Sequence, residues 1–233
     1  MGDYMLMVLE DETAHAAQAP KDMAELIEQR ARFADRLRAG GKLRDAGRLR
    51  PSREGKRVRP QRVDDGPFAE DGKALGAYYW IEAASVDDAA KLAAECPVLP
   101  ADELDVRPVM KGGIRPDKEG KPGKIFACAV LGNALTEQAW IDVMDRIDAD
   151  TTTRFPADSS LGGNRLQPPS TGKRVATRGE RRAVFDGPFL EAKEVIGGVF
   201  LMRMASLDDV VAWALGSGFL AHGALEIREL WRT

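Results

Sequence analysis

The sequence predicts an α+β fold built twice, as two βαββαβ repeats whose sheets pack against each other. The segment Asp65-Gly66-Pro67-Phe68 returns 121 residues later as Asp186-Gly187-Pro188-Phe189. Residues 65–109 align with 186–230 without a gap, and nearly a third of the aligned positions are identical, far more than ordinary composition gives by chance. The predicted strands are also apolar on both faces, which indicates that both faces are covered.

The similarity extends to both ends of each copy. Residues 4–8 and 125–129 also lie 121 positions apart, whereas 48–58 matches 165–175 at a spacing of 117. The second copy is therefore shorter near its first helix and longer before its repeated motif. We predict a first repeat at 1–110, a linker at 111–123 rich in glycine, proline and charge, and a second repeat at 124–233.

In the first repeat a strand is expected at 4–9, followed by a helix behind Pro20 that ends at Gly40-Gly41. The apolar residues of that helix recur at helical spacing: Met23, Leu26, Ile27, Phe33, Ala34 and Leu37. Trp140, Val143, Met144 and Ile147 repeat the pattern in the second copy. A strand, a hairpin and a further strand then complete the first half of each repeat.

The second helix of each repeat begins with Ser-x-Asp-Asp, at Ser85 and Ser206. Serine accepts hydrogen bonds from the free amides of a first helical turn, and acidic residues favour the positive end of the helix dipole. Final strands are expected at 104–109 and 225–230. Because residues 4–9, 125–131 and 199–202 are apolar on both faces, we expect the two sheets to cover each other as an intramolecular pseudo-dimer.

The repeated pattern resembles the YCII-related family in its DGPF-type branch. The resemblance rests on Asp-Gly-Pro-Phe-x-Glu, then Gly76 or Gly197, an apolar strand, Ser-x-Asp-Asp, and Val106-Arg107-Pro108. It covers nearly the whole chain, twice; one departure is Ala77, where the second copy has Gly198. It implies ferredoxin-like units paired into a dimeric α+β barrel, in which one duplicated chain supplies both units.

The family resemblance leaves enzymatic activity open. Members of the smaller branch are considered enzymes because of a His on the first helix and an Asp after the second. We expect neither here, since the predicted first helices contain no histidine and Cys96 and Ser217 stand at the acid position. His15 is expected to be exposed and His222 to lie in a loop. Some relatives on this barrel are dehydrochlorinases or isomerases of small aromatic acids, and genes of the DGPF-type branch often neighbour sigma-factor genes.

Four repeated polar residues are the candidate ligand-binding site: Asp65, Arg107, Asp186 and Arg228. The two aspartates can be turn residues that accept backbone amides, which is the preferred interpretation, or can line a cleft and bind or deprotonate a ligand. The two arginines, on the face of the sheet opposite Val106, need an anion, which is either an internal carboxylate such as Asp105, Glu82 or Glu226, or an acidic ligand.

Other polar residues give weaker signals. Glu70 and Glu191 are expected to be solvated or helix-capping, and Cys96 and Cys128 to be buried, inert thiols. Two histidines and two scattered cysteines give no metal-ligand spacing, so neither a metal nor another cofactor is expected.

A net charge of −3 argues against a dedicated nucleic-acid or membrane partner. The segment 42–62 carries nine Lys or Arg but no interleaved aromatics, so we interpret it as a solvated hairpin. The sequence favours a cytoplasmic protein, monomeric or weakly self-associating, that binds a small acidic molecule between its repeats, with isomerase or lyase activity as one option. A regulatory or interaction protein linked to sigma-factor circuits is the alternative.

Overall fold

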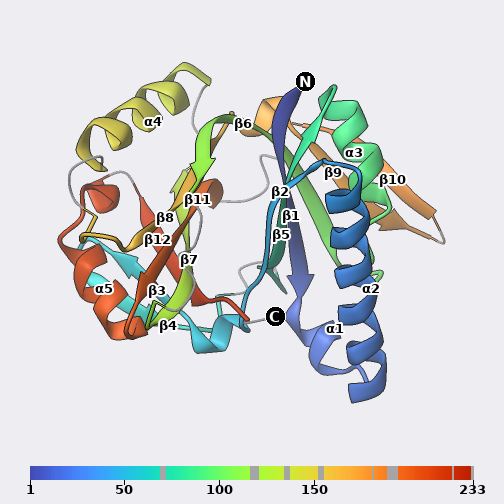
Figure 1. The fold of residues 1–233 in the computed structure, drawn as a ribbon, viewed down its shortest axis with the longest axis horizontal. Coiled ribbons are helices and arrows are strands. Elements are labelled where there is room, and N and C mark those ends of the chain that lie inside the picture. Colours follow the sequence, from blue (N-terminus) through green and yellow to red (C-terminus); the bar gives the residue numbers. More distant parts are fainter. Residues whose placement is uncertain are drawn as a thin grey trace. The chain divides into compact units, whose positions relative to one another are not determined.

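The computed structural model describes residues 1–68, 72–115, 121–133, 137–151, 155–179, 181–187, 194–221 and 223–231. The chain forms two compact units, each of which combines an antiparallel sheet with helices and is therefore α+β, as predicted (Figure 1). Unit 1 comprises Met1–Arg48, Ala69–Val109 and Ser170–Pro188, and unit 2 comprises Leu49–Phe68, Met110–Pro169 and Phe189–Thr233.

Unit 1 has the strand order β2-β5-β1-β6-β9-β10, with α2 and α3 on one face of the sheet (Figure 1). Its elements are β1 (Gly2–Asp11), α1 (Glu12–Ala16), α2 (Pro20–Ala39), β2 (Leu43–Arg48), β5 (Lys73–Ala83), α3 (Val86–Ala94), β6 (Glu103–Ile114), β9 (Lys173–Arg178) and β10 (Arg181–Asp186). The last residues of β6, beyond Val109, belong to unit 2.

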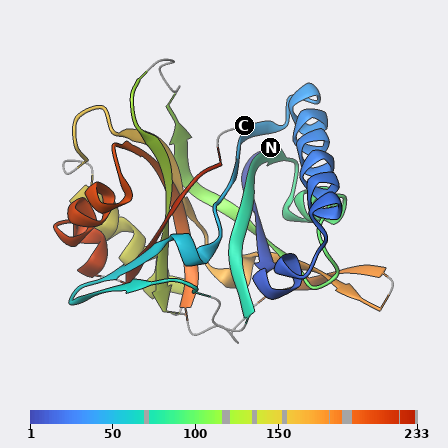
Figure 2. The same cartoon turned by 90° about the horizontal axis from the view of Figure 1, so that it is seen from below.

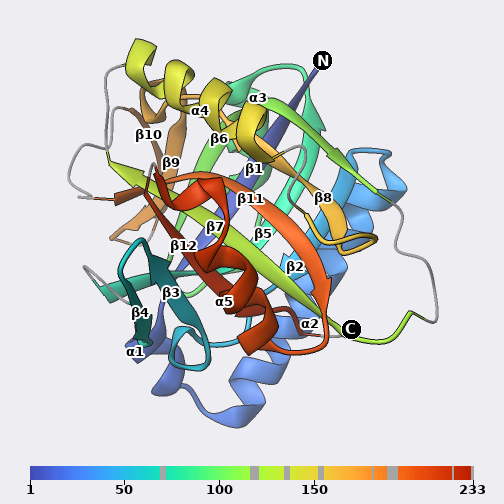
Figure 3. The same cartoon turned by 90° about the vertical axis from the view of Figure 1, so that its left-hand side faces the viewer.

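Unit 2 repeats this order as β8-β11-β7-β12-β3-β4, with α5 lying across the sheet in Figure 3. Its elements are β3 (Lys56–Arg59), β4 (Arg62–Asp65), β7 (Lys124–Asn133), α4 (Glu137–Thr151), β8 (Ser160–Leu166), β11 (Glu194–Met204), α5 (Leu207–Leu215) and β12 (Ala224–Glu229). Short 3₁₀ turns lie at Ser52–Glu54, Pro169–Thr171 and Gly218–Ala221.

The two repeats exchange their hairpins. Hairpin β3–β4, from the first repeat, pairs with β12, whereas hairpin β9–β10, from the second repeat, pairs with β6. The registers are equivalent, because Leu225 faces Val58 and Leu104 faces Val175, at spacings of 121 and 117 residues. Each compact unit is therefore completed by a hairpin of the other repeat. Figure 2 shows β9–β10, in orange, extending from the sheet of unit 1.

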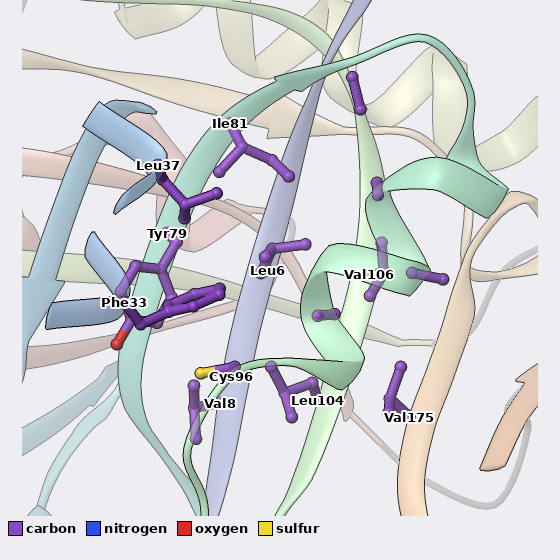
Figure 4. Packing of buried hydrophobic residues seen from close by; sticks show 14 of the residues in the cluster. Leu6, Val8, Phe33, Leu37, Tyr79, Ile81, Cys96, Leu104, Val106 and Val175 are labelled. Atoms are coloured by element: carbon purple, nitrogen blue, oxygen red, sulfur yellow. The ribbon is translucent and has the colours of Figure 1, made fainter. Parts of the chain in front are cut away.

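Each exchanged hairpin contributes an apolar side chain to the core that it joins. Figure 4 shows Val175 of β9 packed with Leu104 and Val106 of β6 in the core of unit 1, where Leu6, Phe33 and Tyr79 also meet. Val58 of β3 occupies the equivalent place in the core of unit 2 and is fully buried. A six-stranded sheet thus buries more apolar surface in each unit than the four βαββαβ strands alone.

The structure corrects the alignment of the first strands by one residue. The pair Met5–Trp80 in unit 1 corresponds to Ala127–Leu201 in unit 2, so β1 and β7 are related by 122 residues rather than 121. With this register Tyr4, Leu6 and Val8 match Phe126, Cys128 and Val130, which all face the cores. Because both strands are apolar on both faces, their sequence pattern could not define the register.

Other local predictions are confirmed. Ser85 and Ser206 accept hydrogen bonds from the amides of Asp88 and Asp209, at 3.1 and 3.2 Å, and begin α3 and α5. Side chains on both faces of β1 are buried, including Met5 and Met7 on the face opposite Leu6. The packing of one sheet on the other stays a prediction. Among the helices described, none has the length and apolar character needed to cross a membrane.

Candidate functional site

A buried carboxylate, Asp102, is the centre of a polar cluster in unit 1. It follows α3 and immediately precedes β6, and its side chain is 0% exposed. Its oxygens accept from the backbone amides of Asp11 at 3.1 Å and Leu99 at 2.9 Å, and lie 2.9 and 3.0 Å from His15 Nε2. Arg30 Nη2 lies 3.5 Å away. A buried charge with this many donors is well compensated.

His15 lies on α1, a short helix directly after β1. Asp11 caps this helix by accepting from the amide of Ala14 at 2.9 Å. The expectation that His15 is exposed is wrong, because only 11% of its side chain is accessible. The expectation that the first repeat lacks a His–Asp pair is wrong as well. Helix α1 was not predicted because it precedes Pro20, where the long helix was expected to begin.

Glu10 and Arg30 extend the cluster. The guanidinium of Arg30 forms an ion pair with Glu10 through Nη1 and donates from Nε to the carbonyl of Pro97 at 2.9 Å. Gly76 makes room for Glu10, because a Cβ at this position would collide with the Glu10 carboxyl group. The repeated glycine that identifies the family pattern thus admits a charged side chain to the end of strand β1.

The pKa of His15 is raised above its ordinary value of 6.5. Burial lowers this pKa, but the hydrogen bond to Asp102 and the negative charges of Glu10 and Asp102 outweigh burial. The shift thus favours the protonated imidazole, and imidazole is the side chain most often used in general acid–base chemistry.

Cys96 and Tyr79 lie close to the cluster but remain protonated. Burial raises the pKa of the Cys96 thiol to about 11, and burial also raises the pKa of the neighbouring Tyr79 hydroxyl well above its usual range. The prediction that Cys96 is buried is confirmed, and Cys128 is likewise buried and free; that both thiols are inert stays a prediction. Neither cysteine has the low pKa of a nucleophile.

The second repeat does not reproduce this site. Eight residues separate β1 from α2, but only three separate β7 from α4, so α1 and His15 have no counterpart. Gly223 stands at the position that aligns with Asp102. A Cβ added at Gly223 would collide with the carbonyl of Leu131, so no aspartate fits there without rearrangement. Elsewhere in unit 2 Phe200, the counterpart of Tyr79, packs in an aromatic cluster with Phe155, Trp213 and Phe219.

The aspartates of the repeated motif lie away from this cluster, in hairpins. Asp65 and Asp186 are 78% and 82% exposed, and each forms an ion pair with the lysine opposite it, Lys56 or Lys173. The amides of Gly66 and Gly187 continue the two hairpins. The role of the two aspartates, as turn residues or toward a ligand, stays a prediction.

The turn after Asp65 is fixed by close packing. A Cβ on Gly66 would collide with the backbone of Ser52, whose hydroxyl accepts from the amide of Phe68 at 3.1 Å. Phe68 is buried, as expected of an anchor for the turn, and the Arg57 guanidinium lies 4.7 Å from the centre of its ring. Together with the hairpin ion pairs, this packing gives the repeated motif a structural role.

Arg107 and Arg228 are each 1% exposed. Arg107 Nη1 lies 3.7 Å from Asp105 in unit 1, and Arg228 Nε lies 3.4 Å from Glu226 in unit 2. Burial lowers the pKa of Arg107, and the Asp105 carboxylate opposes this effect. Both arginines thus have an internal carboxylate nearby, and both of these carboxylates were named from the sequence. Their role toward a ligand stays a prediction.

Glu70, Glu191 and His222 lie outside the described residues. Within the described ranges, no group of three or more His, Cys, Asp or Glu side chains is arranged to hold a metal ion.

The basic segment 42–62 is largely neutralised by nearby acids. At least seven of its nine cations form ion pairs: Arg44, Arg50, Arg53, Lys56, Arg57, Arg59 and Arg62. Arg57 reaches Glu226 at 2.8 Å, and Arg59 reaches Glu194 at 3.0 Å. The contacts of Arg57 and Arg59 attach the exchanged hairpin to the sheet of unit 2.

Comparison with known proteins identifies the family. The model of the YCII-related domain matches residues 4–112 and 160–233, which together form most of the chain. The chain belongs to the YCII-related family. The first matched segment of this YCII-related protein contains Glu10, His15, Arg30 and Asp102.

No curated protein sequence matches this YCII-related chain. Among solved structures, an anthrone oxidase-like protein is similar at 9% identity and a TM-score of 0.46, with 99% of this chain and 92% of that chain covered. A heme-binding protein from Thermus thermophilus is similar at 8% identity and a TM-score of 0.43, with the same coverage.

Proposed function

We propose that this protein binds a small acidic molecule and transfers a proton on it, with His15 as the acid–base group and Asp102 as the residue that orients it. The observation that carries the proposal is the contact between His15 Nε2 and a completely buried Asp102. A carboxylate that holds one imidazole nitrogen fixes the orientation of the ring and stabilises the imidazolium.

The chemistry follows from the two nitrogens of the ring. Asp102 engages Nε2, and the other nitrogen, Nδ1, is the one that can exchange a proton with a bound molecule. Nδ1 accepts a proton from an activated C–H, the imidazolium forms beside Asp102, and the same proton returns to a neighbouring atom or to a leaving group. Isomerases and lyases of small acids use this sequence of steps.

One cation near the His15–Asp102 pair, Arg48, is suited to hold an anionic ligand. Arg48 is half-buried and interacts with the charges of Glu10 and Arg30. Burial lowers the pKa of Arg48, and the Glu10 charge counteracts this effect. A guanidinium at such a position is suited to a carboxylate. Asp65 and Asp186 act in the hairpin turns within this proposal, and Arg107 and Arg228 keep their internal carboxylates.

We assign the chain to the DGPF-type branch and interpret its two repeats as a tandem duplication in which only the first copy kept the acid–base site. The repeated motif, the shared strand order and the equivalent hairpin registers support this interpretation. The two buried, free cysteines fit a reducing, cytoplasmic location.

The proposal is tested with a panel of small aromatic and keto acids. Thermal shift first selects those that stabilise the protein, and proton NMR in D₂O then follows exchange of their activated C–H protons. We expect at least one compound to bind and to exchange, and His15→Gln to slow its exchange by ~100-fold or more while binding persists. His222→Gln is the matched control and should exchange at the wild-type rate. A ligand whose exchange is the same in His15→Gln and wild type would overturn the proposal.

A further inference from the structure

Hairpin β9–β10 is longer than its counterpart, and the additional residues lie in unit 1. The hairpin of the first repeat turns after the pair Arg59–Arg62, whereas the hairpin of the second repeat continues to the pair Arg178–Arg181. Residues 177–179 and 181–182 therefore extend beyond the part that the two hairpins share. Arg182 belongs to this extension and comes from the second repeat, although it packs in the unit that holds His15 and Asp102.

Arg182 binds the end of α3. Its Nη1 donates to the carbonyl of Ala94 at 2.8 Å and also to the carbonyl of Cys96. The last carbonyls of a helix have no partner within the helix, and a cation at this end also interacts favourably with the helix dipole. In unit 2 the corresponding region is satisfied locally, because the Ser217 hydroxyl donates to the carbonyl of Ala214 at 2.7 Å.

The carbonyls that Arg182 binds begin the segment that leads to the dyad. Residues 96–102 connect the end of α3 to Asp102. Arg30 holds this segment by donating to the carbonyl of Pro97. At the end of the segment the Leu99 amide donates to the Asp102 carboxylate, and the Asp102 amide donates to the Leu99 carbonyl. Arg182 is thus the anchor at the start of the segment, and Asp102 is the acceptor at its end.

We propose that Arg182 is a positioning residue for the acid–base site, so that the second repeat completes the site of the first. The inference rests on the proposed function of His15 and Asp102. Arg182 holds residues 94–96 so that the Asp102 carboxylate meets His15 Nε2. Arg182 and the Asp102 carboxylate also attract each other electrostatically, and this attraction helps to hold the segment that carries Asp102.

The test is an NMR titration of His15, which is straightforward because the chain contains only two histidines. His222→Gln assigns the signals. Removal of the anchor in Arg182→Ala should weaken the hydrogen bond from His15 to Asp102 and lower the pKa of His15 by ~0.5 unit or more, since that bond favours the charged imidazole. Arg182→Lys keeps a cation that can donate to the same carbonyls with a different geometry, and should recover part of this shift but not all of it. Arg181→Ala removes the exposed neighbouring charge on the same strand and should leave the pKa of His15 at its wild-type value.

A wild-type or higher pKa of His15 in a folded Arg182→Ala protein would overturn the inference, and a lower melting temperature alone would then identify Arg182 as a structural contact only. If Arg182→Ala does not fold, Arg182→Lys decides: a pKa between the wild-type and Asp102→Asn values supports positioning, and a wild-type pKa with reduced stability contradicts it. Failure of the proposed dyad has a different signature, because Asp102→Asn itself would then leave the pKa of His15 unchanged.

Discussion

The exchanged hairpins predict that a substitution in one repeat weakens the core of the other. Val58 belongs to the first repeat but packs in the core of unit 2, and Val175 belongs to the second repeat but packs in the core of unit 1. Val→Ala removes two methyl groups, or ~1.6 kcal/mol of transfer free energy, and the cavity that remains raises the total to about 2–3 kcal/mol. Each variant should therefore lose this much free energy of unfolding in urea.

The matched controls lie directly across each hairpin. Val63 pairs with Val58 and Val184 pairs with Val175, but these two side chains are 41% and 46% exposed. Val63→Ala and Val184→Ala should cost no more than about 0.5 kcal/mol.

Hydrogen exchange identifies which unit is weakened. Val58→Ala should accelerate exchange of the amides in β7, β11 and β12, and Val175→Ala those in β1, β5 and β6. Faster exchange in β1 and β5 of the Val58→Ala protein, with β7 and β11 unchanged, would refute the exchange of hairpins.

Three further predictions concern the polar cluster. Gly76→Ala should displace Glu10 from Arg30 and cost about 2 kcal/mol or more in urea unfolding, whereas Gly113→Ala, where the structure leaves open space around a Cβ, should cost under ~0.5 kcal/mol. Because burial raises the pKa of Cys96 to about 11, iodoacetamide at pH 8 should modify this thiol ~100-fold more slowly in the native protein than in urea, and equal rates would contradict its burial. The raised pKa of His15 stabilises the fold below the unfolded pKa of 6.5, and this contribution is lost as the pH rises through the folded pKa. The difference in unfolding free energy between wild type and His15→Gln should thus be larger at pH 6 than at pH 9, and a pH-independent difference would argue against the shift.

Local features were predictable from the sequence because each depends on a few neighbouring residues. The serine caps of α3 and α5 and the turn at Asp65 follow from capping and turn chemistry. The family also follows from the repeated motif. The exchange of hairpins could not be predicted from the sequence. Strands β3 and β9 have the same apolar pattern, so either strand can pair with the edge of either sheet.

The acid–base pair was missed because its two residues are 87 positions apart, one on a very short helix and the other in the loop before β6. Asp102 lies six residues beyond Cys96, the position expected for the acid, and His15 lies on a helix of five residues. One signal could have indicated the helix. Eight residues separate Asp11 from Pro20, against three in the second copy, and Asp11 is an effective N-cap.

The central claim is that Asp102 holds His15 as an acid–base group in the first repeat. The most direct measurement is the pKa of His15 by NMR in wild type and in Asp102→Asn. We predict a wild-type value above 6.5 that falls in Asp102→Asn, because the variant loses the negative charge that favours the imidazolium and offers His15 only a neutral amide oxygen as acceptor. A wild-type value at or below 6.5, or the same value in both proteins, would contradict the claim.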